Sequence, residues 1–184
     1  MISITTSRLI LRSWQESDIE PFYQINQDRH VIEYLAGSLT YQQVRGFIDK
    51  HNQQLKQRGY TLWAVELKHT GELIGFVGLN LIDFDLPFTP AVEIGWRLGS
   101  QYWGQGYATE AAQAALDYGF NKCGLTDIVS FTNPANQRSI RLMERLGMQR
   151  DQTQDFYHPR LAQDHPLAFH VVYRSIPISY ESKA

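Results

Sequence analysis

Two glycines near the middle of the chain lie where a predicted strand meets a predicted helix. Val92–Leu98 reads as a short strand, a helix is predicted from Ala108 to about Lys122, and Gly104 and Gly106 lie between them. Glycine lets a backbone approach a ligand closely, and the first N–H groups of a helix have no partner within it. Such a helix start attracts an anion such as a pyrophosphate. A tight turn before a closely packed helix is the alternative interpretation.

The spacing around these glycines excludes two common nucleotide loops. The segment contains no Gly-Lys-Ser/Thr for a P-loop, and its glycines do not follow G-x-G-x-x-G. Small side chains on one face of the following helix predict close packing against a sheet; they are Ala108, Ala111, Ala112 and Ala115.

Two polar residues lie at the start of a second predicted helix, Asn136–Leu146, which Gly147 should end. Ser139 shares a helical face with three apolar residues, so its hydroxyl should point inward and needs a partner. Back-bonding to the carbonyl four residues earlier is the alternative to a functional role. Asn136 suits an N-cap. A different face of the helix, in water or near a ligand's phosphates, carries Arg138, Arg141 and Arg145.

Two residues are candidates for a general base. Glu93 shares a strand face with Arg97, and an ion pair between the two on the sheet surface is the alternative. His158 lies in a predicted loop and titrates near neutral pH, although a solvated loop histidine is the alternative. We expect no metal site, because known ligand spacings are not matched by His158, His165 and His170.

The elements that must position these residues follow from periodicity and capping signals. Ser17-Asp18-Ile19-Glu20 has the spacing of a capping box and predicts a helix towards Gln27. Thr40–Gln43 repeats that signal and predicts a helix that ends at Gly59. Strands are predicted over Arg8–Arg12, Tyr60–Leu67, Leu73–Leu81, Val92–Leu98, Asp127–Thr132, Gln149–Phe156 and Ala168–Arg174. Antiparallel hairpins followed by a βαβα unit favour one α/β or α+β domain with helices on both faces, over residues 1–176, with a tail at 177–184.

Composition excludes several classes of protein. The 184 residues are 43% hydrophobic and 20% charged, which is typical of a globular domain. The formal charge of −2 argues against a nucleic-acid partner bound through phosphate neutralisation. A single cysteine, Cys123, permits no internal disulfide and fits a reducing compartment. No signal peptide or membrane-length apolar run is read, so a cytoplasmic protein with no membrane partner is expected.

The glycine loop, here Trp103–Ala108, and the residues after it carry a resemblance to a known family. Trp103-Gly104-Gln105-Gly106-Tyr107-Ala108-Thr109-Glu110-Ala111 resembles the acetyl-CoA pyrophosphate loop of the GNAT superfamily of N-acetyltransferases, and more narrowly its ribosomal-protein N-terminal (RimJ/RimL-type) branch. Trp103 departs from the Gln or Arg that many members have there. Further matching pieces are Thr6–Arg12, Asn136–Leu142, Leu146–Met148 and His165–Leu167.

The resemblance implies a fold and a coenzyme site. The fold would be a GNAT-like mixed, mostly antiparallel sheet of about seven strands with about four helices, splayed between the fourth and fifth strands. Acetyl-CoA would bind as cosubstrate, with its pyrophosphate on the amides of Gln105, Gly106, Ala108 and Thr109. Its pantetheine arm would pair with the strand edge near Trp96, Arg97 and Leu98. The remaining coenzyme contacts would come from Trp103, Gly104, Tyr107, Asn136 and Ser139, and Ser139 would also give a proton to the departing sulfur.

The reaction expected from this resemblance is direct attack of a primary amine on the thioester. An α-amine with a pKa near 8 is about a tenth neutral at pH 7, whereas a lysine amine is below about 0.1% neutral, so a protein N-terminus needs only a modest base. A small-molecule acceptor (amino acid, polyamine or aminoglycoside), a non-catalytic CoA sensor and an unrelated nucleotide-binding module are the alternatives. Monomers and homodimers are both common in the resembled family. Acceptor specificity is expected from Val31–Leu35, Phe84–Phe88 and His158–His165.

Overall fold

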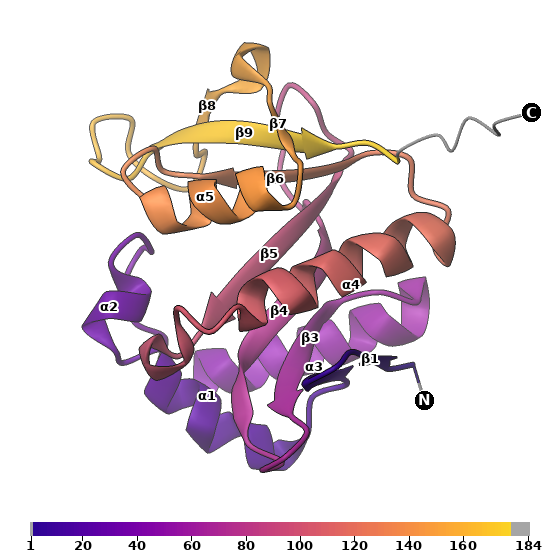
Figure 1. Cartoon of the computed structure of the whole chain (residues 1–184). Helices are drawn as coiled ribbons and strands as arrows, with labels where there is room; N and C mark the ends of the chain where they lie inside the picture. Colours follow the sequence, from indigo (N-terminus) through magenta and orange to yellow (C-terminus); the bar gives the residue numbers. More distant parts are fainter. Residues whose placement is uncertain (1, 178–184) are drawn as a thin grey trace, which may run out of the picture.

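One mixed sheet runs through the protein, in a computed structural model that describes residues 2–177 (Figure 1). Its nine strands follow the order β1-β2-β3-β4-β5-β6-β9-β7, with β8 paired to β9. The strands are β1 Ile4–Thr5, β2 Leu9–Arg12, β3 Leu62–Leu67, β4 Leu73–Leu81, β5 Val92–Leu98, β6 Ile128–Thr132, β7 Gln149–Arg150, β8 Phe156–Tyr157 and β9 Phe169–Ser175. The α-helices are α1 Ile19–Ile25, α2 Arg29–Ile32, α3 Tyr41–Arg58, α4 Tyr107–Asn121 and α5 Gln137–Arg145.

Helices cover both faces of the sheet, with α4 and α5 on one side and α1 and α3 on the other (Figure 1). On the α4 side, buried aliphatic residues of the strands pack against three alanines of α4 that are fully buried, Ala111, Ala112 and Ala115. On the α1–α3 side the core combines aliphatic and aromatic residues, with Phe22 packed 5.9 Å from Phe76 of β4, centroid to centroid. Every helix within residues 2–177 is too short or too polar to span a membrane.

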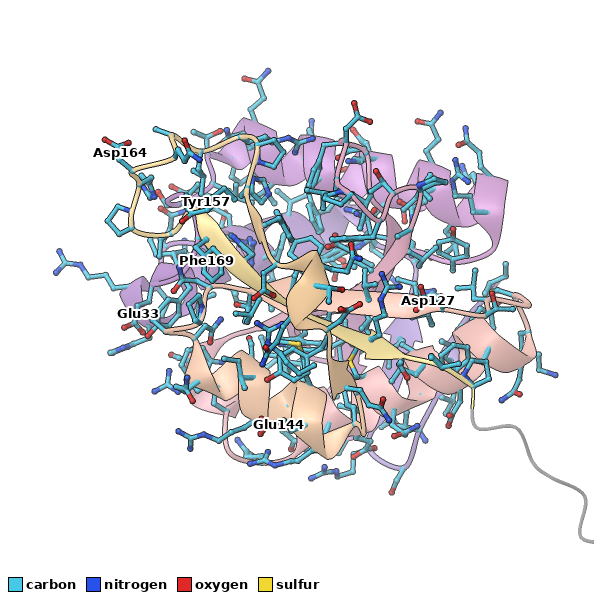
Figure 2. All side chains as sticks on the ribbon, turned by 90° about the horizontal axis from the view of Figure 1, so that it is seen from above. Glu33, Asp127, Glu144, Tyr157, Asp164 and Phe169 are labelled. Carbon is cyan, nitrogen blue, oxygen red and sulfur yellow. The ribbon has the colours of Figure 1, made fainter. Side chains whose placement is uncertain are left out.

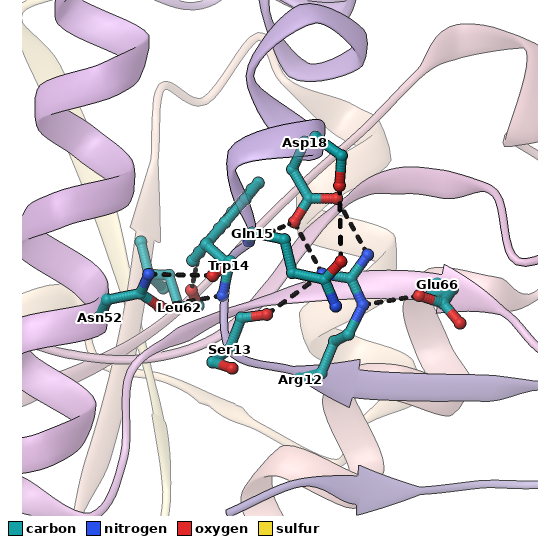
Figure 3. A network of polar contacts seen from close by, with 9 residues as sticks. Arg12, Ser13, Trp14, Gln15, Asp18, Asn52, Leu62 and Glu66 are labelled. Carbon is teal, nitrogen blue, oxygen red and sulfur yellow. Dashed lines mark hydrogen bonds and ion pairs between the residues drawn. The ribbon is translucent and has the colours of Figure 1, made fainter. Parts of the chain in front are cut away.

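The two predicted capping boxes have different outcomes. Thr40 accepts the N–H of Gln43, Gln43 caps Thr40 in return, and α3 ends at Gly59 in the left-handed conformation, so this prediction is confirmed. The box at Ser17–Glu20 is wrong, because the 3-10 turn Glu16–Asp18 precedes α1 and its N-cap is Gln15, two positions before Ser17. Asp18 accepts the backbone N–H of Gln15 at 2.8 Å and also binds Arg12, as Figure 3 shows. Ion pairing of Asp18 with a neighbouring strand therefore fixes where the first helix begins.

Further corrections concern short elements. The predicted strand Gln149–Phe156 is broken, since Asp151 caps a 3-10 turn between β7 and β8 and accepts the N–H of Thr153 at 3.2 Å. Such local side-chain bonds compete with a strand ladder. Two very short elements, β1 and α2, were not predicted, the first strand begins at Leu9, and the first helix ends at Ile25. Over residues 2–177 the sheet consequently has nine strands and not about seven, and this range contains five α-helices and not about four. Residues 178–184 of the expected tail lie outside the described residues.

The central strand β5 is paired very differently along its two edges. With β4 it forms an antiparallel ladder along its whole length, from Val92 opposite Leu81 to Leu98 opposite Gly75. With β6 it pairs in parallel at only two positions, Val92 with Ile128 and Glu93 with Val129. The splay expected between the fourth and fifth predicted strands is therefore confirmed. We call the space between β5 and β6 beyond these two pairs the gap.

Candidate active site

The start of α4 carries free backbone donors. Gly106 is the N-cap residue with φ +80°, and no side chain caps the helix there. The N–H of Glu110 makes the first intrahelical bond, to the carbonyl of Gly106 at 3.0 Å, so the preceding helical N–H groups have no acceptor within the helix. Gly104 also has a positive φ of +74°, and a Cβ there would meet nothing within 4 Å. The geometry therefore leaves room for an anion close to the loop, and α4 is also closely packed, so the structure is compatible with both interpretations of the glycine loop.

Side chains from two other elements hold the glycine loop in place. The Nε of Arg8 forms an ion pair with Glu110 at 2.7 Å, and its Nη1 donates to the carbonyl of Gln105 at 2.9 Å. On the other side, the indole N–H of Trp103 donates to the carbonyl of Leu98 at 2.9 Å. The guanidinium of Arg138 lies over the Trp103 ring, 4.4 Å from its centroid. Trp103 thus links the end of β5 to α5.

The open edge of β5 presents unpaired backbone groups to the gap. The N–H of Gly99 donates to Ile74 beside β4 at 3.0 Å, so the odd-numbered residues of this strand face β4 and the even-numbered ones face β6. Accordingly, the carbonyl of Ile94 accepts from Ser130 of β6 at 3.0 Å, just past the last strand pair. The N–H and C=O of Trp96 are next along this edge, and they point into the gap.

Ser139 and Trp96 meet across the gap. The indole N–H of Trp96 donates to Ser139 Oγ at 3.3 Å, so the hydroxyl finds its partner on β5 and not in back-bonding within its own helix. A hydroxyl that accepts one bond keeps its own O–H free to donate. The N-cap prediction for Asn136 is confirmed, since its side chain accepts the N–H of Ser139 at 3.3 Å and donates to Thr132 Oγ1 at 3.0 Å.

Glu93 lies at the last β5–β6 pair and is partly buried on the α1–α3 side of the sheet. Asn80 Nδ2 of β4 donates to one of its carboxylate oxygens at 3.1 Å. Burial raises the pKa of Glu93, and the Asn80 hydrogen bond opposes that rise in part. The alternative ion pair with Arg97 is wrong, because the guanidinium of Arg97 donates to Asn26. Within residues 2–177, Asn80 Oδ1 is buried without a hydrogen-bond partner.

His158 is packed and not freely solvated. Its ring centroid lies 4.9 Å from that of Phe84 and 5.3 Å from that of His170. Burial, followed by the charges of His170 and Arg160, lowers the pKa of His158. Its Nδ1 accepts the backbone N–H of Arg160 at 3.2 Å. Within the described range, no three His, Cys, Asp or Glu side chains cluster closely enough to hold a metal ion.

A cavity of about 510 Å³ extends from the glycine loop past the gap to α2. Most of the predicted coenzyme residues line this cavity, namely Trp96, Arg97, Leu98, Trp103, Gly104, Gly106, Tyr107, Ala108, Thr109, Asn136 and Ser139. The predicted residues Gln105, Glu93 and His158 do not line it. The predicted specificity segment Val31–Leu35 contributes Val31, Tyr34 and Leu35. Figure 2 shows Glu33 of that segment and Asp164 of the 158–165 segment at the same edge of the molecule.

The structure adds residues that the sequence analysis missed. The role of Asn80 beside Glu93 depends on the β4–β5 register, and no local pattern in the sequence indicates it. Tyr102 and His30 also line the cavity. A helix at His30 has a readable signal, because Asp28 caps α2 by accepting the His30 N–H at 2.9 Å.

Comparisons with known proteins agree with this geometry. The family model for the Acetyltransferase (GNAT) domain matches residues 8–149. The uncharacterized N-acetyltransferase YnaD of Bacillus subtilis is 32% identical over 149 residues, which are 80% of this chain and 83% of that protein. The structure resembles a GNAT-family acetyltransferase from Bacillus anthracis with a TM-score of 0.77 and 27% identity, covering 95% of this chain and 98% of the other. It shares its fold with the ribosomal L7/L12 α-N-protein acetyltransferase RimL, solved with coenzyme A (TM-score 0.74, 19% identity, covering 95% and 97%).

Proposed function

Because the chain belongs to the GNAT acetyltransferase family, we propose that it acetylates the α-amine of a protein N-terminus by direct attack within a ternary complex. Enzymes of this family take their acetyl group from acetyl-CoA, and the chain is an acyltransferase of this kind. An unrelated nucleotide-binding module, one alternative from the sequence, is therefore wrong. The proposal rests above all on the Trp96–Ser139 contact across the gap, beside a helix start that no side chain caps.

Acetyl-CoA binds in the cavity between the glycine loop, β5 and α5. The amides of the glycine loop and of the first turn of α4 bind the pyrophosphate. The exposed arginines of α5 add positive charge around the phosphates; they are Arg138, Arg141 and Arg145. A pantetheine amide N–H donates to the free C=O of Trp96, which leaves the Trp96 N–H for the reacting group. This arrangement places the thioester in the gap, opposite Ser139.

The reaction needs only modest help from the protein. The neutral amine forms a bond to the acetyl carbon, the C–S bond breaks, and CoA leaves as thiolate. A thiol with a pKa near 8.5 is a tolerable leaving group, so the Ser139 O–H suffices as a hydrogen-bond donor or proton relay to the sulfur. The N–H of Trp96 or Leu98 stabilises the developing oxyanion. The proton lost by the amine passes to a base, directly or through one water.

Glu93 fits the role of base better than His158. A carboxylate with a raised pKa is a stronger base than an ordinary one, and Asn80 holds one of its oxygens in place. By contrast, His158 Nδ1 already accepts a hydrogen bond, so the neutral ring carries its proton on Nε2. That tautomer leaves no free lone pair on His158 to take a proton.

The charge of the cavity favours an α-amine over a polyamine. Every formally charged side chain at its wall is an arginine, namely Arg97, Arg138, Arg141 and Arg145. A polycation such as spermidine would be repelled there several times more strongly than a singly charged N-terminus. RimL, a protein of the same fold, is named for acetylating a protein α-amine, which supports this choice. A small amino acid acceptor is the second candidate on the same grounds.

Thiol release from acetyl-CoA tests the proposed function. We expect release well above background with peptides that begin with Ser, Ala or Met, and much slower release with spermidine or with a peptide whose only amine is a lysine side chain. Acetylation should be confirmed on the peptide N-terminus by mass spectrometry. Tight acetyl-CoA binding with background release for every amine would instead identify a CoA sensor.

A further inference from the structure

The side chain of Arg97 projects from the face of β5 opposite to the face that packs against α4. Trp96 and Leu98 pack with the α4-side core, whereas Arg97 lies on the face that also carries Glu93, which we call the acceptor face. Between the two, Gly95 has no side chain, and a Cβ there would meet only a Leu62 methyl at 3.8 Å. The acceptor face of β5 thus has an acid at one end, a guanidinium at the other and open space between.

The hydrogen bonding of Arg97 differs from that of the other partly buried arginines. Arg12 forms ion pairs with Asp18 at 2.7 Å and with Glu66 at 2.6 Å (Figure 3). Arg150 and Arg174 also have carboxylate partners. Within residues 2–177, Arg97 has none: its partners are the neutral side-chain oxygen of Asn26 and the ring of Phe76, 5.5 Å away.

This environment leaves a charged group without a counterion. Burial lowers the pKa of Arg97 to about 10, so the side chain is still protonated at pH 7. A guanidinium has five N–H donors, and the contact with Asn26 engages one nitrogen. Arg97 also lines the cavity, whose wall carries no Asp or Glu among the described residues. A partly desolvated cation of this kind is stabilised by an anion from outside the chain.

We propose that Arg97 binds a carboxylate of the acceptor, so that the substrate is an amine that also bears a carboxylate close to its reacting nitrogen. This inference rests on the proposed function. The N–H of Trp96 faces the thioester, and the next residue sends its side chain to the acceptor face, so the two groups of the substrate lie close together. A carboxylate can take two parallel N–H bonds from the guanidinium, which gives orientation as well as affinity.

The carboxylate can belong to either of two kinds of acceptor. In a free amino acid the carboxylate is its own, and in a protein N-terminus it is an Asp or Glu side chain among the first residues. Matched pairs distinguish them: alanine, serine and methionine against their amides for the first, and Ser-Glu-amide against Ser-Gln-amide for the second. We expect one of the two types of pair to show a preference for the acid.

Two variants test Arg97 through this acid preference, measured as the ratio of kcat/KM for acid and neutral acceptor. Arg97→Gln keeps an N–H donor for Asn26 but removes the charge. Asn26→Asp keeps the guanidinium but gives it an internal carboxylate partner. We expect each variant to lower the preference about 10- to 100-fold, because kcat/KM falls more for the acid than for the neutral acceptor, and Arg97→Lys to retain part of it. Because each ratio is compared with that of the wild type, the different amine pKa values of acid and amide cancel.

A purely structural role for Arg97 predicts a different pattern, in which acid and neutral acceptors slow equally in Arg97→Gln and Asn26→Asp leaves the ratio unchanged. Either result overturns the proposal, as does a weaker acetyl-CoA affinity in Arg97→Gln, which would place Arg97 in the coenzyme site. A second readout needs no turnover: in the presence of CoA, N-acetylmethionine should raise Tm more than its amide, in the wild type alone. N-acetyl-Ser-Glu-amide against N-acetyl-Ser-Gln-amide gives the same comparison for the peptide source. If nothing is acetylated, the proposed function fails, and the Tm shifts of these two pairs still decide for or against Arg97.

Discussion

The two edges of β5 show how one strand serves both stability and chemistry. Its edge towards β4 is paired from Val92 to Leu98, while its edge towards β6 is paired only at Val92 and Glu93. The backbone is regular along both edges, so the difference lies in where β6 runs. Because β6 diverges to pair with β9 at five positions, the Trp96 backbone is left without a strand partner. An unpaired edge inside a fold is a binding site for another extended chain, here the pantetheine arm.

The polar side chains beyond β4, on and beside β2 and β3, differ in the same way from those beside the gap and on the acceptor face. On the closed side, Arg12, Asp18 and Glu66 satisfy one another in a single network (Figure 3). Beside the open edge, Ser139 keeps a free O–H, and on the acceptor face of β5 Arg97 keeps N–H donors that no described residue engages. We infer that the closed edge holds the strand still while the open edge reserves its donors and acceptors for substrates.

The largest effect is expected from blocking the helix start beside the open edge. Gly106→Trp should lower CoA affinity at least about 1,000-fold, because the indole would fill the pyrophosphate site and the residue has φ +80°. Gly124→Trp is the matched control, with φ +66° and open space around it, far from the loop. Isothermal titration with CoA measures both. Unchanged CoA affinity in Gly106→Trp would remove this loop from the coenzyme site.

The next largest effect is expected at the proposed base, Glu93, which lies where β6 diverges from β5. Glu93→Gln should lower kcat/KM about 100-fold or more and flatten the acid limb of its pH profile. In the wild type this limb falls as pH drops through the raised pKa of Glu93. His158→Ala should keep the limb. Loss of the limb in His158→Ala, with Glu93→Gln retaining it, would exchange the two roles.

A pH effect on stability is expected from His51, a buried residue of α3. Its ring lies 3.3 Å from Thr61 Oγ1, and its pKa is lowered to about 4, mainly by burial. In the folded chain the His51 ring therefore stays neutral at pH values where the unfolded chain binds a proton, below about pH 6.5. The free energy of unfolding should consequently decrease as the pH falls from about 6.5 to 4, by up to about 3 kcal/mol. Thermal unfolding of His51→Gln should show a flatter pH dependence, whereas exposed His69→Gln should behave as wild type. Parallel curves for all three proteins would contradict this account.

The smallest effect on turnover is expected at Ser139, with Ser130, a second serine beside the gap, as its control. Ser139→Ala should lower kcat about 10- to 30-fold with acetyl-CoA affinity retained, because only the hydrogen bond to the departing sulfur is lost. Ser130→Ala removes the bond to Ile94 at 3.0 Å and should cost about 1 kcal/mol of stability with kcat largely kept. Wild-type turnover in Ser139→Ala would exclude it from the reaction.

Local sequence signals predicted much of this molecule. The glycine loop, the Thr40–Gln43 capping box and the N-cap at Asn136 each depend on residues a few positions apart, and each has the expected structure. The capping box expected at Ser17 is wrong because Asp18 pairs with Arg12 on a strand, although α1 does begin nearby at Ile19. The partners of Glu93 and Arg97 come from β4 and α1, far away in sequence. Such long-range contacts depend on register and packing, which one sequence without the fold does not specify.

A crystal structure with CoA bound tests most directly the claim that the open edge of β5 presents the thioester. We expect the pyrophosphate on the amides at the start of α4, the pantetheine paired with the Trp96 backbone, and the sulfur within hydrogen-bond reach of Ser139 Oγ. A coenzyme bound away from the gap, or a β6 that closes onto β5 when CoA binds, would contradict the account.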